Sequence, residues 1–233
     1  MNVPWRARAT PVVAVAIVLI LGVVFVALTL RQPDVATYAP TIAAPRDAGR
    51  ALVGPQLYTV DATSPERWTY FSFRVGAVVE GPGGRTWDLA FRRYQILANG
   101  GPGFQGEGGV VDLGALRFDD VRSVPTTGYV PNEGGVDPRN PAIAGWYRYG
   151  FFSHVLTPKP HAWAIRTADG RYAKVEIVSY YCPRAQPGCV TFRYAYQGDG
   201  SPVVSRAAAA RSPRSASCGR DGAASSRCSP GWT

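Results

Sequence analysis

The chain has 233 residues, of which 46% are hydrophobic, and it contains 26 glycines and 20 prolines. This length can bury one sizeable core, and so many turn-forming residues favour strands and turns over long helices. The net charge of +9 comes mostly from the two ends, because residues 1–31 contribute +3 and residues 203–233 contribute +4. A folded nucleic-acid-binding face is therefore not expected.

The run from Pro11 to Leu30 has twenty residues without a charge and is flanked by arginines. Such a run is typical of a helix that crosses a membrane or of a long signal peptide. The run ends in Leu28–Arg31, without the small residues that usually precede a cleavage site, so we expect residues 1–31 to be an uncleaved anchor. Secretion after signal cleavage is the alternative. Either way, the rest of the chain is expected outside the cytoplasm, on the periplasmic or cell-surface side.

The four cysteines are interpreted in the light of export, because an oxidising compartment favours disulfides. Cys182 and Cys189 bracket a short loop between two strand-like runs, so we expect them to form a disulfide. Cys218 and Cys228 lie in a tail rich in Ser, Ala and Arg, where they could pair or remain free. Spacings of seven and ten do not fit the Cys-x-x-Cys pairs of a four-cysteine zinc site.

Alternating apolar and polar residues predict several strands. One strand is expected over 67–80 and another over 86–97, with a β-bulge at Arg92–Arg93 where the alternation changes phase. Residues 162–181 are interpreted as two strands joined by an Asp-Gly turn, and residues 190–197 as a further strand. The fold class is therefore expected to be all-β.

The composition divides the rest of the chain into three parts. Residues 32–55 are rich in Pro, Ala and Thr and are expected to be a spacer. The β domain is expected over 56–200. Residues 201–233 contain few apolar side chains and are expected to be a disordered basic tail.

Motifs for catalysis are weak. Residues 101–106, GPGFQG, fit Gly-x-Gly-x-x-Gly, but a dinucleotide site needs the third glycine to open a helix, and here a loop and a strand follow. Asp119 and Asp120 are adjacent, so on an extended chain their side chains point in opposite directions. Because no nucleophile–base pair can be named, the chain is predicted not to be an enzyme.

Both histidines, His154 and His161, lie in the aromatic-rich stretch 146–163. Two imidazoles on one iron place their nitrogens about 4 Å apart. On a straight strand, residues seven apart are separated by roughly 23 Å, so only a turn at 157–160 could bring these two together. The aromatic residues around them could either fill a β core or line a pocket for a flat ligand.

Several blocks of the chain together resemble the HmuY family of exported bacterial haem-binding proteins with an all-β fold. The resemblance covers about residues 56–197. Its blocks are WTYFSFRVGAVVE (68–80), WDLAFRRYQILANGG (87–101) continuing into PGFQGEGGVV, VPTTGYV (124–130), RTADGRYAKVEIVSYY (166–181) and VTFRYAYQ (190–197).

The resemblance implies an antiparallel β-sandwich or meander in which two axial side chains from loops hold haem, for delivery to an outer-membrane uptake system. The FFSH segment ending at His154 is similar to a segment that carries a family ligand, so His154 is the best candidate. The other ligand is expected in the loop 131–145, which has neither His nor Met. His161, Tyr147 and Tyr149 are weaker candidates, because imidazole and phenolate both bind haem iron.

The function expected from these residues is that of an exported, membrane-anchored protein that binds haem or a related planar apolar ligand, for iron acquisition. One form of this hypothesis is five-coordinate haem on His154, with the sixth position open or taken by a tyrosine. The alternative is a non-catalytic interaction or structural β module that has lost haem ligation.

Overall fold

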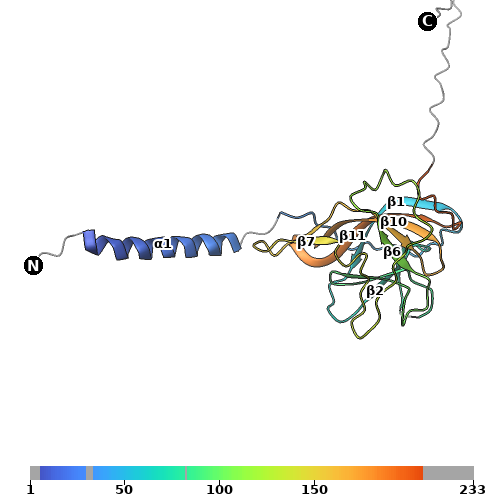
Figure 1. Ribbon diagram of the computed structural model, residues 1–233, viewed down its shortest axis with the longest axis horizontal. Coiled ribbons are helices and arrows are strands. Elements are labelled where there is room, and N and C mark those ends of the chain that lie inside the picture. The colour runs from blue at the N-terminus through green and yellow to red at the C-terminus, as the bar shows by residue number, and fades with distance from the viewer. Residues whose placement is uncertain (1–5, 30–33, 82, 207–233) are drawn as a thin grey trace, which may run out of the picture.

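The computed structural model describes residues 6–29, 34–81 and 83–206, and it contains one long helix and a β domain (Figure 1). Cys218, Cys228 and most of the predicted basic tail lie outside the described residues. Residues 11–29 of the apolar run lie in helix α1 (Arg6–Thr29), and Leu30 lies outside the described residues. Within the part of the chain that is described, no helix is both long enough and apolar enough to cross a membrane, so the structure does not support the predicted transmembrane role of residues 11–30.

The β domain is built from antiparallel sheets, which confirms the all-β prediction. The larger sheet has five strands in the order β1-β11-β10-β9-β6. Its strands are β1 (Leu52–Asp61), β6 (Gly109–Asp112), β9 (Trp163–Arg166), β10 (Tyr172–Cys182) and β11 (Gln186–Gln197). A short 3-10 helix, η1 (Pro183–Ala185), joins β10 to β11.

The smaller sheet has four strands in the order β3-β2-β4-β5. Its strands are β2 (Thr69–Ser72), β3 (Ala77–Val79), β4 (Leu89–Arg92) and β5 (Gln95–Ala98). The remaining two strands of the described residues, β7 (Tyr147–Tyr149) and β8 (Leu156–Pro158), form a separate hairpin.

The two larger sheets pack face to face through buried aromatic rings. Phe71 of β2 and Phe91 of β4 lie with their ring centroids 5.2 and 5.5 Å from that of Phe192 on β11. All three side chains are fully buried. The predicted alternation in 190–197 is thereby confirmed, because Val190, Phe192, Tyr194 and Tyr196 face this core.

Two strand predictions were wrong in the same way. The expected strand 67–80 is a hairpin, because residues 73–76 form a turn in which Gly76 has a φ of 60°. The expected bulge at Arg92–Arg93 is also a hairpin turn, in which Arg92 pairs with Gln95 and Arg93 has a φ of 51°. At the first turn the apolar alternation of the sequence simply continues, although Tyr70 pairs with Val79 in the structure. At the second turn the alternation changes phase, which a bulge and a hairpin turn both produce, so the pattern alone did not show that the chain reverses.

The predicted hairpin over 162–181 and the predicted disulfide are both confirmed. Strands β9 and β10 pair antiparallel, and their connecting turn contains Gly170 with a φ of 82°. Cys182 and Cys189 form a disulfide across the connection between β10 and β11.

The segment expected to be a spacer runs along the β domain rather than away from it. The backbone N–H of Tyr38 donates to Tyr181 O at 2.9 Å, and that of Ala48 donates to Arg74 O at 2.8 Å. At the other end of the domain, Val204 N donates to Arg122 O at 2.9 Å, so the chain stays in contact with the domain just beyond β11.

Candidate functional site

His154 lies in the loop of the β7–β8 hairpin. The hairpin pairs Tyr147 with Pro158 and Tyr149 with Leu156. The loop is closed by hydrogen bonds from Gly150 N to Val155 O and from His154 N to Gly150 O, both 2.8 Å long. His154 has a φ of 53°, a left-handed conformation that a non-glycine residue rarely adopts, and its side chain is exposed.

The hairpin is fixed to the larger sheet at the same place. The N–H of Leu156 donates to the hydroxyl of Tyr181, at the end of β10, over 2.8 Å. Lys159 N also donates to Trp146 O at 2.8 Å, and Trp146 is fully buried in the main core. The loop that carries His154 is therefore attached to rigid structure through both strands of the hairpin.

A cavity of about 660 Å³ opens beside His154, between this hairpin and the β10–β11 connection. Its size falls within the range of about 300–1,000 Å³ that is usual for cofactor sites. The walls are mainly aromatic and aliphatic. The lining residues are Arg93, Tyr94, Tyr147, Tyr149, Ser153, His154, Val155, Leu156, Tyr180, Tyr181, Ala185 and Pro187.

The imidazole of His154 is oriented by Tyr149. The distance between His154 Nδ1 and Tyr149 Oη is 2.5 Å, so the two share a short hydrogen bond. When Nδ1–H is the donor, Nε2 keeps its lone pair. This arrangement resembles the one found at haem and metal sites, where the second nitrogen of a ligating histidine donates to a neighbouring oxygen. The donor set at His154 thus fits an iron ligand.

Two of the tyrosines in the wall, Tyr147 and Tyr180, have a raised pKa. Burial raises the pKa of Tyr147, and the neighbouring Tyr94 raises it further. Burial likewise raises the pKa of Tyr180. A raised pKa disfavours the phenolate form of Tyr147 that would ligate iron. Tyr147 lines the wall of the cavity, and Tyr149 contacts the imidazole of His154.

His161 lies apart from this cavity and is engaged elsewhere. Its Nδ1 lies 3.0 and 3.1 Å from the two carboxylate oxygens of Asp112, on β6. Its ring also lies 5.8 Å from that of Trp163, measured between centroids. Of the four residues proposed from the sequence, the structure therefore brings together His154, Tyr147 and Tyr149 but not His161.

The loop 131–145 contributes no side chain to the cavity wall. It is tied instead to β5, because the side chain of Asn132 accepts from Ala98 N at 3.2 Å and donates to Ala98 O at 2.5 Å. Asn140 donates in turn to Asn132 Oδ1 at 3.2 Å. Within the described residues, no group of three or more His, Cys, Asp or Glu side chains is arranged to hold a bare metal ion.

Comparison with known proteins identifies the family. The family model described as HmuY protein matches residues 64–194. The chain belongs to the HmuY family. No curated protein matches it at a significant level.

Solved structures of the HmuY type share the fold. An apo HmuY analog from Tannerella forsythia is 18% identical with a TM-score of 0.51, over 65% of this chain and 99% of that one. A Bacteroides vulgatus protein, proposed to be HmuY-like and haem-binding, is 21% identical with a TM-score of 0.50, over 66% and 96%. A proposed lipoprotein of Bacteroides fragilis is 22% identical with a TM-score of 0.51, over 66% and 95%.

Sequence reasoning missed part of the cavity wall. Arg93 and Tyr94 come from the β4–β5 turn, and Tyr180 and Tyr181 from the end of β10. Arg93 and Tyr94 lie more than fifty positions before the β7–β8 loop, and Tyr180 and Tyr181 lie 25 and 26 positions after it, on the second strand of the next hairpin. Adjacent residues of a strand point to opposite faces, and Tyr180 and Tyr181 are both buried, which the sequence alone does not show.

Proposed function

We propose that this HmuY-family protein binds haem, or a related planar apolar ligand, in the cavity beside the β7–β8 hairpin, with His154 Nε2 as the axial ligand. The observation that carries the proposal is the His154–Tyr149 hydrogen bond of 2.5 Å at an aromatic-walled cavity of about 660 Å³. Haem, when bound, supplies an iron that accepts the imidazole. The chain supplies the oriented ligand, apolar walls and the positive charge of Arg93 for the carboxylates of haem.

The family and the geometry support the proposal from separate directions. HmuY-like proteins are known for binding haem, and one similar structure is proposed to be haem-binding. The geometry favours ligation by a single histidine, because His161 is bound to Asp112 and the loop 131–145 does not line the cavity. Transfer of the ligand to an outer-membrane uptake system stays a prediction from the family.

A haemin titration of the full chain, followed at the Soret band, tests this function. We expect a shifted band that saturates at one haem per chain and that is lost in His154→Ala. Tyr149→Phe should still bind, but more weakly, because the imidazole loses its hydrogen-bond acceptor; removing such a partner costs about 10- to 100-fold in affinity.

His161→Ala is the matched control, since it removes the other imidazole of the chain without touching the cavity. It should leave the titration unchanged. A folded wild-type chain that leaves the haemin spectrum unaltered would overturn the proposal and favour an interaction or structural module that has lost haem ligation.

We also infer that the β domain works outside the cytoplasm. The support is the apolar run at 11–30, the disulfide between Cys182 and Cys189, and the similarity to a proposed lipoprotein. Fractionation of cells that express the full chain should place it outside the cytoplasm. The mass of the recovered chain then distinguishes a retained N-terminus from a cleaved signal. A cytoplasmic chain with reduced cysteines would contradict export.

A further inference from the structure

A second, smaller cavity lies on the outer face of the four-stranded sheet. Strands β2 and β4 send Phe71, Leu89 and Phe91 into the main core, whereas the residues between them face outward. On that outer face, Trp87, Ala90 and Leu97 form a separate cluster of buried apolar side chains. The cavity above this cluster has a volume of about 150 Å³.

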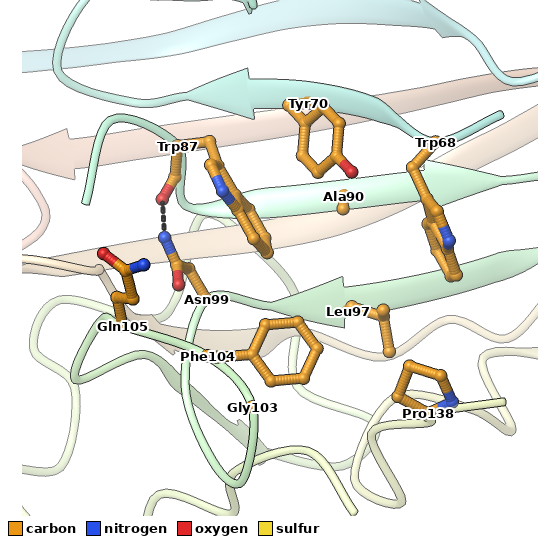
Figure 2. A pocket seen from close by; sticks show the side chains of 10 residues that line it. All are labelled: Trp68, Tyr70, Trp87, Ala90, Leu97, Asn99, Gly103, Phe104, Gln105 and Pro138. Carbon is orange, nitrogen blue, oxygen red and sulfur yellow. Dashed lines mark hydrogen bonds between the residues drawn. The ribbon is translucent and has the colours of Figure 1, made fainter. Parts of the chain in front are cut away.

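Ala90 creates the cavity. It lies directly opposite Tyr70 on one neighbouring strand and Leu97 on the other, so the three side chains form a row across the sheet. Because the middle side chain is a single methyl group, space remains above it between its larger neighbours. Figure 2 shows Ala90 at the floor, with Trp87 and Trp68 at the two ends of the gap.

The glycine-rich loop 101–106 supplies the remaining wall. Gly106 packs so closely that a Cβ there would lie 2.3 Å from Asn99 O, and a Cβ on Gly101 would lie 2.5 Å from Asn132 O. These glycines let the loop lie close to the sheet. The ring centroid of Phe104 then lies 6.0 Å from that of Trp87, in an edge-to-face arrangement. The Gly-x-Gly-x-x-Gly pattern thus builds an aromatic wall instead of a phosphate site.

We propose that this cavity binds an uncharged single aromatic ring that carries a hydroxyl group, such as a phenol. The volume decides the size of the ligand, because apolar cavities of about 150 Å³ admit a benzene ring. The walls decide its character, since four aromatic rings from Trp68, Tyr70, Trp87 and Phe104 offer edge-to-face contacts.

The hydrogen-bonding groups of the wall suit one hydroxyl. The hydroxyl of Tyr70 makes no hydrogen bond within the described residues, and it points into the cavity in Figure 2. Of the other polar side chains in the wall, Gln105 is exposed, and the buried Asn99 already uses both N–H donors on Gly84 O and Trp87 O, at 3.0 and 2.9 Å. A sugar, with several hydroxyls to satisfy, therefore fits this cavity poorly.

Charge disfavours a cationic ligand, although aromatic cages often bind quaternary ammonium groups. The guanidinium of Arg92 already lies over the ring of Trp68, 4.5 Å from its centroid. Arg85 also donates to Gln105 O at 3.1 Å, beside the cavity. Among the described residues that line the cavity there is no carboxylate, so a neutral ring is the better match.

Binding of 4-fluorophenol to the full chain, measured by 19F NMR, tests the proposal. We expect saturable binding that weakens at least about tenfold in Ala90→Leu, because the larger side chain fills the gap above the sheet. Phe104→Ala should weaken binding as well, and it tests the cavity independently if Ala90→Leu does not fold. Tyr70→Phe should weaken binding of 4-fluorophenol but leave that of fluorobenzene unchanged.

Two controls separate this cavity from the proposed haem site. His154→Ala should leave the binding of 4-fluorophenol unchanged, and Ala90→Leu should leave the haemin titration unchanged. Equal binding of 4-fluorophenol by wild type and by folded Ala90→Leu and Phe104→Ala would overturn the proposal. So would stronger competition by tetramethylammonium than by fluorobenzene, which would identify a site for cations.

Discussion

At the scale of single residues, Asp88 connects parts of the fold that lie far apart in sequence. Its carboxylate accepts from Phe73 N, in the β2–β3 turn, at 2.7 Å and from Ala168 N, in the β9–β10 turn, at 3.0 Å. The side chain is fully buried, and burial raises its pKa to about 6 despite these hydrogen bonds. A carboxylate at this position therefore joins the two sheets at the cost of desolvating its charge.

We predict that the contribution of Asp88 to stability increases as the pH falls. The pKa is higher in the folded chain than in the unfolded chain, so protonation favours folding, and the cost of the charge is largest above pH 6. When the pH falls from 7 to 4, the free energy of unfolding of wild type should increase by on the order of 3 kcal/mol relative to that of Asp88→Asn, which has no charge to titrate at this position.

Urea unfolding of both proteins at several pH values measures this difference. The other carboxylates titrate in both proteins, so the difference in their free energies of unfolding isolates the effect of Asp88. A difference that stays constant with pH, or that shrinks toward pH 4, would contradict the prediction.

Lys174 is a second buried polar residue whose role depends on distant chain segments. Its ammonium group donates to Phe118 O at 2.8 Å and to Val121 O at 2.7 Å, and so holds the loop after β6 against β10. Lys174→Met keeps the length of the side chain but leaves both carbonyls without their donor. We expect a loss of about 2–4 kcal/mol in the free energy of unfolding. Lys159→Met, on a more exposed lysine, is the control, and an equal loss in both variants would contradict this role.

At the scale of elements, the connection between β10 and β11 links stability to the candidate haem site. The disulfide between Cys182 and Cys189 closes this connection, and Ala185 and Pro187 within it line the larger cavity. Replacing both cysteines by alanine should lower the free energy of unfolding by about 2–3 kcal/mol, since the bridge closes a short loop in the unfolded chain.

The same double substitution should also weaken haemin binding, because the disulfide no longer restrains Ala185 and Pro187 in the wall of the larger cavity. Chemical unfolding and the Soret titration measure the two effects. Reduced wild-type protein should behave like the variant. Unchanged stability on reduction would show that packing alone holds the connection.

The elements also show how far the sequence predicts the fold. The β9–β10 hairpin and the Cys182–Cys189 bridge were predictable, because an Asp-Gly turn and a cysteine pair are local signals. The reversals at Gly76 and Arg93 were not, because the sequence alternation continues through the first turn, and its change of phase at the second turn fits a bulge as well as a hairpin. At the candidate site, the sequence pointed to His154 and its neighbours on β7, which line the cavity. The rest of the wall comes from β4–β5 and β10, and the sequence does not show which distant segments meet.

At the scale of the whole molecule, residues 34–48 act as a strap across both sheets. Thr37 forms a parallel bridge with Tyr181 on β10, and Thr41 N donates to Thr59 O on β1 at 2.9 Å. Further along, Arg46 N donates to Val75 O at 3.0 Å, in the turn of the smaller sheet. The strap therefore reaches the same Tyr181 whose hydroxyl holds the hairpin of His154.

This connection predicts that shortening the N-terminal side of the domain affects the candidate haem site. A chain that begins at residue 49 loses the backbone hydrogen bonds of the strap and should be less stable by on the order of 2–5 kcal/mol than one that begins at residue 34. It should also bind haemin more weakly, because the backbone of Tyr181 loses its bridge to Thr37 and is then less restrained. Urea unfolding and the Soret titration of the two chains test both effects. If the two chains bound haemin equally well, the strap would stabilise the sheets without positioning His154.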